Sequence, residues 1–139
     1  MAVEKPKAKP ICGIYMIKCI ANDKTYIGSS SDVMRRIKTH KRELENGSHN
    51  NLLLQHEYTK YGADKFVFKI IDQNLEEDLL LAYEKCYCYI YNSVVKYKGY
   101  NNIFPPTNHK LFKQAYLNLK KRNIIWFYSI LLFINKYIL

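Results

Sequence analysis

Two tyrosine–glycine pairs near the start of the chain have a spacing that suits a pair of reactive phenols. Gly13 and Tyr15 lie in one β-rich run, and Tyr26 and Gly28 lie in the next. Residues two apart in a strand share one face, so a hairpin of these runs would set the phenols side by side. The glycines would leave room beside them for a backbone or a phosphate. Each tyrosine taken singly is also explained as a core residue, because the chain has 13 tyrosines.

A basic pair and a carboxylate further along could complete a site for phosphate chemistry. Arg36 and His40 are four residues apart, which places them on one face of a helix beside its apolar stripe. Glu84 falls close to the apolar side of a later predicted helix, where a carboxylate needs a partner. A divalent cation is one such partner, because Mg²⁺ often takes only one or two carboxylates and fills its shell with water and phosphate. The alternatives are a solvated helix face for the basic pair and a lysine ion pair for Glu84.

The elements that must position these residues form one small α+β domain. Apolar periodicity, turn residues and helix caps predict the order ββααβα, with an antiparallel hairpin first. Strands are expected over 11–20, 24–29 and 66–72, and helices from Asp32 to Glu45, over 50–61 and from about Glu76 to Asn92. Pro105-Pro106 mark a boundary, and a basic, helical stretch is expected over 111–122.

Length and charge narrow the class of protein. The 139 residues allow one modest domain, and 22 Lys and Arg against 12 Asp and Glu give a net charge of +10. A domain this basic attracts polyanions, of which phosphate backbones are the commonest. An anionic membrane surface and a merely soluble basic protein are the competing explanations.

The cysteines and the N-terminus indicate the compartment. Cys12, Cys19, Cys86 and Cys88 form no metal-binding spacing, so we expect free thiols in a reducing environment. The N-terminal segment is charged and has no apolar run, so it is not a signal peptide. We therefore expect an intracellular protein of the cytoplasm, nucleus or virion that is not secreted.

Taken together, the motifs resemble the GIY-YIG nuclease family. Gly13-Ile14-Tyr15, a ten-residue spacer and Tyr26-Ile27-Gly28 match the family's two-part signature. Arg36, His40 and Glu84 follow in the family's order. The family's later aromatic, Asn-Ser and Gly-Tyr-Asn positions are matched by Tyr87, Asn92-Ser93 and Gly99-Tyr100-Asn101. The resemblance covers about residues 11–103.

The resemblance implies a fold, an activity and a set of roles. The fold is a three-stranded antiparallel sheet flanked by helices, and the activity is hydrolysis of DNA phosphodiesters with one divalent cation, Mg²⁺ or another such as Mn²⁺. Glu84 would hold the metal, and Arg36 would stabilise charge on the phosphate. Tyr15 or Tyr26 would help activate water, and His40 would orient or share a proton. The site would be supported by Gly13, Gly28 and Asn101, and DNA contacts are expected from Lys24, Arg35, Lys38 and His49.

The identity of the general base stays open at this stage. A free phenol has a pKa of about 10, so lowering it by ~3 units needs roughly 4 kcal/mol of differential stabilisation. Arg36, a metal on Glu84 and the basic surroundings would all act in that direction. His40 is the rival base, because imidazole titrates near neutrality without any shift.

The sequence divides into a flexible basic leader at 1–10, a nuclease domain at 11–104 and a C-terminal tail at 105–139. The apolar end, 123–139, is too short in its uninterrupted core to span a membrane, so we expect it to pack against the domain or a partner. Membrane association is the alternative. The function expected is a DNA endonuclease of a mobile element, virus or phage, or a repair-type enzyme, with no small-molecule cofactor. A non-catalytic nucleic-acid-binding domain with the same fold, or a membrane-attached protein, are the rival hypotheses.

Overall fold

The computed structural model describes residues 7–122. The apolar end at 123–139 and the first six residues of the leader lie outside the described residues, so the expectations for them stay predictions. The strands are β1 (Gly13–Cys19), β2 (Thr25–Ser30) and β3 (Phe66–Gln73). The helices are α1 (Val33–Glu45), α2 (Leu52–Tyr61), α3 (Leu80–Ile90) and α4 (His109–Lys121), with short 3₁₀ turns at Ala63–Lys65, Glu77–Leu79 and Val95–Tyr97.

The three strands form one antiparallel sheet in the order β2-β1-β3, as predicted. The β1–β2 connection is tight because the side chain of Asn22 accepts a hydrogen bond from the Lys24 N–H at 3.0 Å, and Asp23 adopts a left-handed conformation with φ 64°. In this register Tyr15 lies opposite Gly28, and Ile17 lies opposite Tyr26. The hairpin therefore places both signature tyrosines on one face of the sheet.

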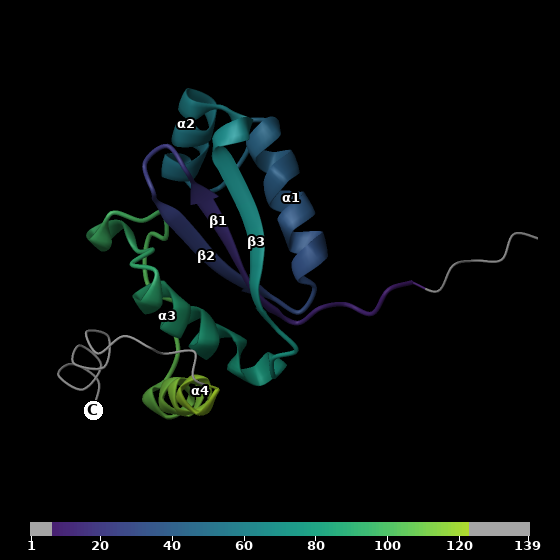
Figure 1. The fold of residues 1–139 in the computed structure, drawn as a ribbon, viewed down its shortest axis with the longest axis vertical. Coiled ribbons are helices and arrows are strands. Elements are labelled where there is room, and N and C mark those ends of the chain that lie inside the picture. The colour runs from purple at the N-terminus through teal and green to yellow at the C-terminus, as the bar shows by residue number, and fades with distance from the viewer. Residues whose placement is uncertain (1–6, 123–139) are drawn as a thin grey trace, which may run out of the picture.

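Helices cover both faces of the sheet (Figure 1). Alternate residues of β1 serve opposite faces, as a strand requires. Tyr15 and Ile17 pack with the helices α1 and α2, whereas Ile14 and Met16 pack with α3 and α4. The core is thus divided by the sheet into two layers, and the tyrosines face the layer of α1.

Side-chain caps fix the ends of the helices near the sheet. Asp32 accepts a hydrogen bond from the Arg35 N–H and begins α1, as its residue type predicted. Asn51 does the same for α2, which ends at Gly62 with φ 89°. The predicted third helix begins later than expected, because Glu77–Leu79 form a 3₁₀ turn before α3. Its last residue is Ile90, two residues before the predicted end.

The two signature glycines are required by close approaches within the chain. A Cβ on Gly13 would lie 2.2 Å from the backbone oxygen of Asp72 on β3. A Cβ on Gly28 would lie 2.3 Å from the hydroxyl oxygen of Tyr15. The space expected for a backbone or a phosphate is therefore filled by a neighbouring strand in one case and by the Tyr15 ring in the other.

Helix α4 belongs to the same core as the rest of the domain. Its inner side chains Phe112, Ala115, Tyr116 and Leu119 are buried in the cluster formed with β1, β2 and α3. Immediately after it, Arg122 forms a bidentate salt bridge with the buried Asp72 of β3, at 2.7 and 3.0 Å. The predicted boundary at 104/105 thus does not end the packed unit. Within residues 7–122, no helix has the length and apolarity to cross a membrane.

Replacing Phe112 by Ala tests whether α4 stabilises the domain. Phe112 is 2% exposed, so the substitution should lower the free energy of unfolding by about 3–5 kcal/mol. Leu117→Ala, on the outer face of the same helix, should change it by less than about 0.5 kcal/mol. Urea unfolding of both variants measures the difference, and equal small effects would show that α4 does not contribute to the core.

Candidate functional site

Side chains from β2, α1, α3 and the segment after Tyr100 meet around a cavity of about 380 Å³. Tyr26, Arg36, His40, Glu84 and Asn101, all predicted as site residues, lie in its wall. The remaining wall is formed by Glu43, His49, Asn50, Asn51, Leu81, Asn102, Ile103, Phe104, Pro105 and Pro106. The fold therefore gathers in one place residues that are up to 75 positions apart in the sequence.

Tyr15 lies behind this wall and is 1% exposed. Its hydroxyl forms a 2.6 Å hydrogen bond with Nε2 of His40. Burial raises the pKa of the Tyr15 phenol, and the charge of Arg36 opposes that effect only in part. The expected lowering of the phenol pKa is therefore absent from the protein alone, because removal from water outweighs the nearby guanidinium.

Tyr26 is the signature tyrosine that faces the cavity. Its ring lies 6.4 Å from that of Tyr15 and 5.5 Å from that of His40, measured between ring centroids. Burial raises the pKa of Tyr26, and the Glu84 carboxylate raises it further, whereas Arg36 and the Tyr15 hydroxyl act in the opposite direction. A cation beside Glu84 would oppose one of the effects that keep this phenol protonated.

A chain of hydrogen bonds fixes the protonation of His40. The backbone N–H of Asn51 donates to Nδ1 of His49 at 3.0 Å, so a neutral His49 carries its proton on Nε2. That proton points at Nδ1 of His40, 2.7 Å away, which leaves the proton of His40 on Nε2. His40 accordingly donates to the oxygen of Tyr15. The backbone at the start of α2 thus determines the tautomer of His40 in α1.

Both histidines are held neutral. Burial, the charge of Arg36 and the neighbouring His49 lower the pKa of His40 to about 3. Burial also lowers the pKa of His49. His40 is only 1% exposed, so it does not lie on a solvated helix face. Its neutral ring can orient Tyr15 but is a weak proton acceptor.

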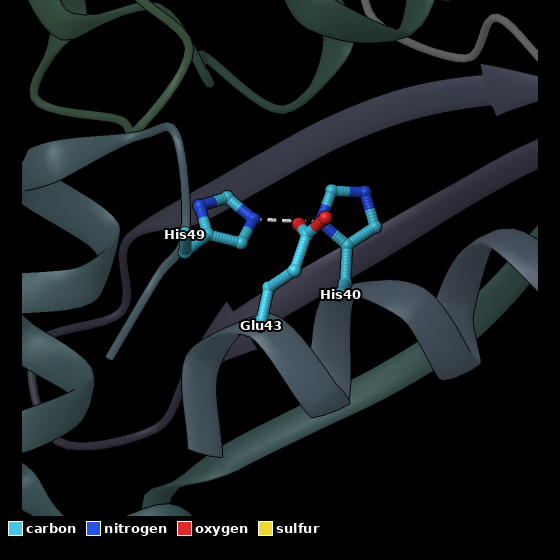
Figure 2. Close-up of side chains that lie close together, drawn as sticks. All are labelled: His40, Glu43 and His49. Carbon is cyan, nitrogen blue, oxygen red and sulfur yellow. Dashed lines mark hydrogen bonds between the residues drawn. The ribbon is translucent and has the colours of Figure 1, made fainter. Parts of the chain in front are cut away.

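His40, Glu43 and His49 also form a group with metal-ligand chemistry. One ligand atom from each lies within 4.8 Å of the others, and Figure 2 shows Glu43 beside the bonded imidazoles. A metal ion between the rings would need a lone pair on Nε2 of His49. The proton would then move to Nδ1 and displace the Asn51 N–H, which costs a buried hydrogen bond. The bonding pattern therefore favours a hydrogen-bond network that orients the two rings over a metal centre.

Glu84 fits a divalent cation better. It projects from α3 into the cavity, and burial raises the pKa of its carboxyl group. Its hydrogen-bond partner is the hydroxyl of Ser29 in β2, at 2.5 Å. No salt bridge within residues 7–122 neutralises this carboxylate. A half-buried carboxylate that lines a cavity and has no salt-bridge partner is suited to a hard cation that completes its shell with water and phosphate.

Asn101 joins the segment after Tyr100 to β2. Its side-chain oxygen accepts from the Ile27 N–H at 2.8 Å, and its side-chain nitrogen donates to the Ile27 carbonyl at 2.7 Å. These two bonds extend the strand ladder across the backbone between Tyr26 and Gly28. Asn101 is thus positioned to hold Tyr26 in place, which agrees in geometry with its expected supporting role.

The residues expected to contact DNA differ in their exposure and in their contacts within the protein. Arg35 and Lys38 are exposed on α1. Lys24 instead forms a 2.5 Å salt bridge with Glu57, a buried residue of α2. His49 is 5% exposed and is bonded to His40. The structure therefore gives Lys24 and His49 contacts within the protein.

Three polar residues of the site were missed by sequence reasoning. Ser29 holds the carboxylate of Glu84, Asn51 sets the tautomer of His49, and Glu43 lines the cavity. Glu43 follows His40 at helical spacing, which is a detectable signal. The helix-cap position of Asn51 is another, but its contact with His49 depends on the path of the α1–α2 loop.

Comparison with known proteins places this site in a family. The family model of the GIY-YIG catalytic domain matches residues 11–101. "Intron-associated endonuclease 1" of Enterobacteria phage T4 is 38% identical over 90 residues, which are 64% of this chain and 36% of that protein. "Probable intron-encoded endonuclease 1" of Neurospora crassa is 38% identical over 72 residues, 52% of this chain and 22% of that protein. The chain thus spans about a third or less of the length of these curated relatives.

Solved structures agree with the sequence relatives. The catalytic domain of the homing endonuclease I-TevI superposes with a TM-score of 0.60 at 34% identity, covering 66% of this chain and 98% of that domain. A mutant of the same domain gives a TM-score of 0.61 at 33% identity, covering 70% of this chain and 99% of that domain. Since the family model spans most of the packed domain and the predicted fold is confirmed, the chain belongs to the GIY-YIG family.

Proposed function

We propose that this chain is a metal-dependent DNA endonuclease that hydrolyses phosphodiester bonds. The observation that carries the proposal is the half-buried carboxylate of Glu84, which lines one cavity with Arg36 and Tyr26 and has no cationic partner among the described residues. The relatives are named as endonucleases, which supports the same activity for this domain. Their association with introns supports an origin in a mobile element or phage.

In this proposal Glu84 holds Mg²⁺ or Mn²⁺, with Ser29 fixing its carboxylate. The cation supplies Lewis-acid polarisation of the phosphate and neutralises developing negative charge. The guanidinium of Arg36, in the wall of the same cavity, would stabilise the same charge. Glu84 would thus act on the phosphate through a bound cation, and Arg36 through its own permanent charge.

Tyr26 is the proposed proton acceptor, because it faces the cavity whereas Tyr15 lies behind it. The ionised oxygen of Tyr26 takes a proton from the attacking water as the water oxygen bonds to phosphorus. The opposite phosphorus–oxygen bond breaks, and the leaving oxygen takes a proton from solvent. The chain from Asn51 through His49 and His40 to Tyr15 directs donors toward the tyrosine pair. Because each hydrogen bond in this chain is donated toward the Tyr15 oxygen, the chain favours negative charge on the phenols during the reaction.

DNA is the proposed partner because the chain is basic and the exposed side of α1 carries Arg35 and Lys38. No Asp or Glu follows Glu84 in the sequence, so α4 adds only basic charge to the domain surface. Phosphate contacts of this kind position a duplex without reading its sequence. Arg35 and Lys38 are therefore proposed to orient the DNA backbone beside the cavity.

Substitution of Glu84 tests the metal and the reaction together. Wild-type protein should nick supercoiled plasmid in Mg²⁺ and not in EDTA, and Glu84→Gln should lose at least about 100-fold in rate. The matched control Glu45→Gln changes an exposed residue at the end of α1, so this variant should cleave like wild type. Folded protein that binds DNA without cutting it would favour a non-catalytic nucleic-acid-binding domain.

The same variant has a predicted effect on stability. The folded-state pKa of Glu84 is raised, so ionisation of this group destabilises the fold as the pH rises from the unfolded-state pKa to the folded-state pKa, and the loss is complete above the latter. Metal-free Glu84→Gln should therefore be more stable than wild type at pH 7. Mg²⁺ should raise the melting temperature of wild type and not that of the variant. Thermal unfolding with and without Mg²⁺ measures both effects, and identical Mg²⁺ shifts would remove Glu84 from the metal site.

A phenol base predicts the pH profile of cleavage. Because the pKa of Tyr26 is raised, its ionised fraction is small at pH 7 and grows about ten-fold with each unit of pH. Single-turnover cleavage by wild type should therefore rise between pH 7 and 9 with a slope near one on a logarithmic plot. Tyr26→Phe should lose both the rate and the slope, whereas Tyr91→Phe should keep them. A flat wild-type profile would contradict a tyrosine base.

The neutral His40 predicts a loss of stability in mild acid. Its folded-state pKa is about 3, below the unfolded value, so the stability it contributes is full above pH 6.5 and falls as the pH drops toward 3. Between pH 7 and 5 this amounts to about 2 kcal/mol. Urea unfolding should show a smaller acid-induced loss for His40→Gln than for wild type or His56→Gln. Parallel losses in all three proteins would show that His40 is not held neutral.

A further inference from the structure

Part of the wall of the cavity is apolar and exposed. Ile103 has 74% of its surface exposed, and Leu81 has 48%. Both line the same cavity as Tyr26, Arg36 and Glu84. A phosphate in this cavity would occupy the charged wall, which leaves the apolar wall beside whatever is attached to the phosphate.

Ile103 is held in place although it is exposed. On one side Asn101 is buried and bonded to the Ile27 backbone through both atoms of its amide. On the other side the ring of Phe104 stacks on Tyr89 with centroids 4.2 Å apart and an interplanar angle of 22°. Pro105 is buried and followed by Pro106, and a residue that precedes proline is restricted to extended conformations. The segment therefore presents a fixed apolar side chain at the mouth of the cavity.

Leu81 extends the same surface from α3. It lies three residues before Glu84, so the two side chains are neighbours on one face of the helix. An exposed leucine beside a cation-binding carboxylate gives no stability to the free protein, since water covers it. A ligand that enters the cavity would remove this area from water.

We propose that Ile103, together with Leu81, packs against the nucleoside next to the phosphate that is held in the cavity. This inference rests on the proposed function and adds a substrate contact to it. Apolar side chains in contact with deoxyribose and base faces are a known means of positioning a duplex and of unstacking a base step. Arg36 and the cation on Glu84 then bind the phosphate. Ile103 and Leu81 contact the adjoining nucleoside and so determine which phosphate of the DNA strand enters the cavity.

The contact is tested by binding in EDTA, where no cleavage occurs. A fluorescein-labelled duplex of random sequence is titrated with wild type, Ile103→Ala and Ile103→Leu across a series of salt concentrations. Ile103→Ala should bind about ten-fold more weakly than wild type, and Ile103→Leu should bind like wild type. Because the lost contact carries no charge, the dependence of affinity on salt should be unchanged.

Leu52→Ala is the matched control. Leu52 is 81% exposed on α2 and does not line the cavity, so its removal should leave binding unchanged. Affinity of Ile103→Ala within two-fold of wild type would overturn the inference, and so would an equal loss in the control. A changed salt dependence would also overturn it, because it would indicate a disturbed charged surface.

Cleavage of plasmid in Mg²⁺ separates this inference from the proposed function. If wild type binds but does not cut, and Ile103→Ala still loses binding, the contact stands and the catalytic proposal fails. If wild type cuts and Ile103→Ala binds and cuts equally well, the contact fails alone. If wild type neither binds nor cuts DNA, both fail.

Discussion

The fit of the Tyr15 ring against Gly28 is the constraint on which the site depends. Only a residue without a side chain lets the ring cross β2, since any Cβ there would overlap the phenol. From this position Tyr15 reaches His40 on α1 and so joins both strands of the hairpin to the helix. The two halves of the signature are therefore one packing unit, in which a tyrosine of the first half requires the glycine of the second.

Burial shifts the titratable groups of the site toward their uncharged forms. It raises the pKa of both tyrosines and of Glu84, and it lowers the pKa of His40. The permanent charge of Arg36 is the exception, because a guanidinium does not lose its proton in proteins. Such a site stabilises a single charge poorly, and it is better suited to a ligand that carries a positive and a negative charge together. A cation together with a phosphate is such a ligand, which links the electrostatics of the site to the reaction proposed for it.

The sequence predicted the parts of the site that depend on local geometry. Strand alternation placed Tyr15 and Tyr26 on one face, helical spacing paired Arg36 with His40, and Asp32 marked the start of α1. It could not predict the environment of those residues, because burial depends on packing between elements distant in sequence. His40 was expected at a solvated edge, and its neutral state follows from the α1–α2 loop that brings His49 onto it. The direction of the tyrosine pKa shifts was missed for the same reason.

The packing of α4 also affects the order in which the domain can be completed. Ribosomes release a chain from its N-terminus, so the hairpin, α1 and α3 are made before the helix that covers the outer face of α3. Until Arg122 has emerged, Asp72 lacks its salt-bridge partner and the apolar side chains that meet Phe112 remain in contact with water. The helix that carries Glu84 is therefore fully supported only at the end of synthesis of the packed unit. Folding of the candidate site is in this way coupled to a segment that contributes no residue to the cavity.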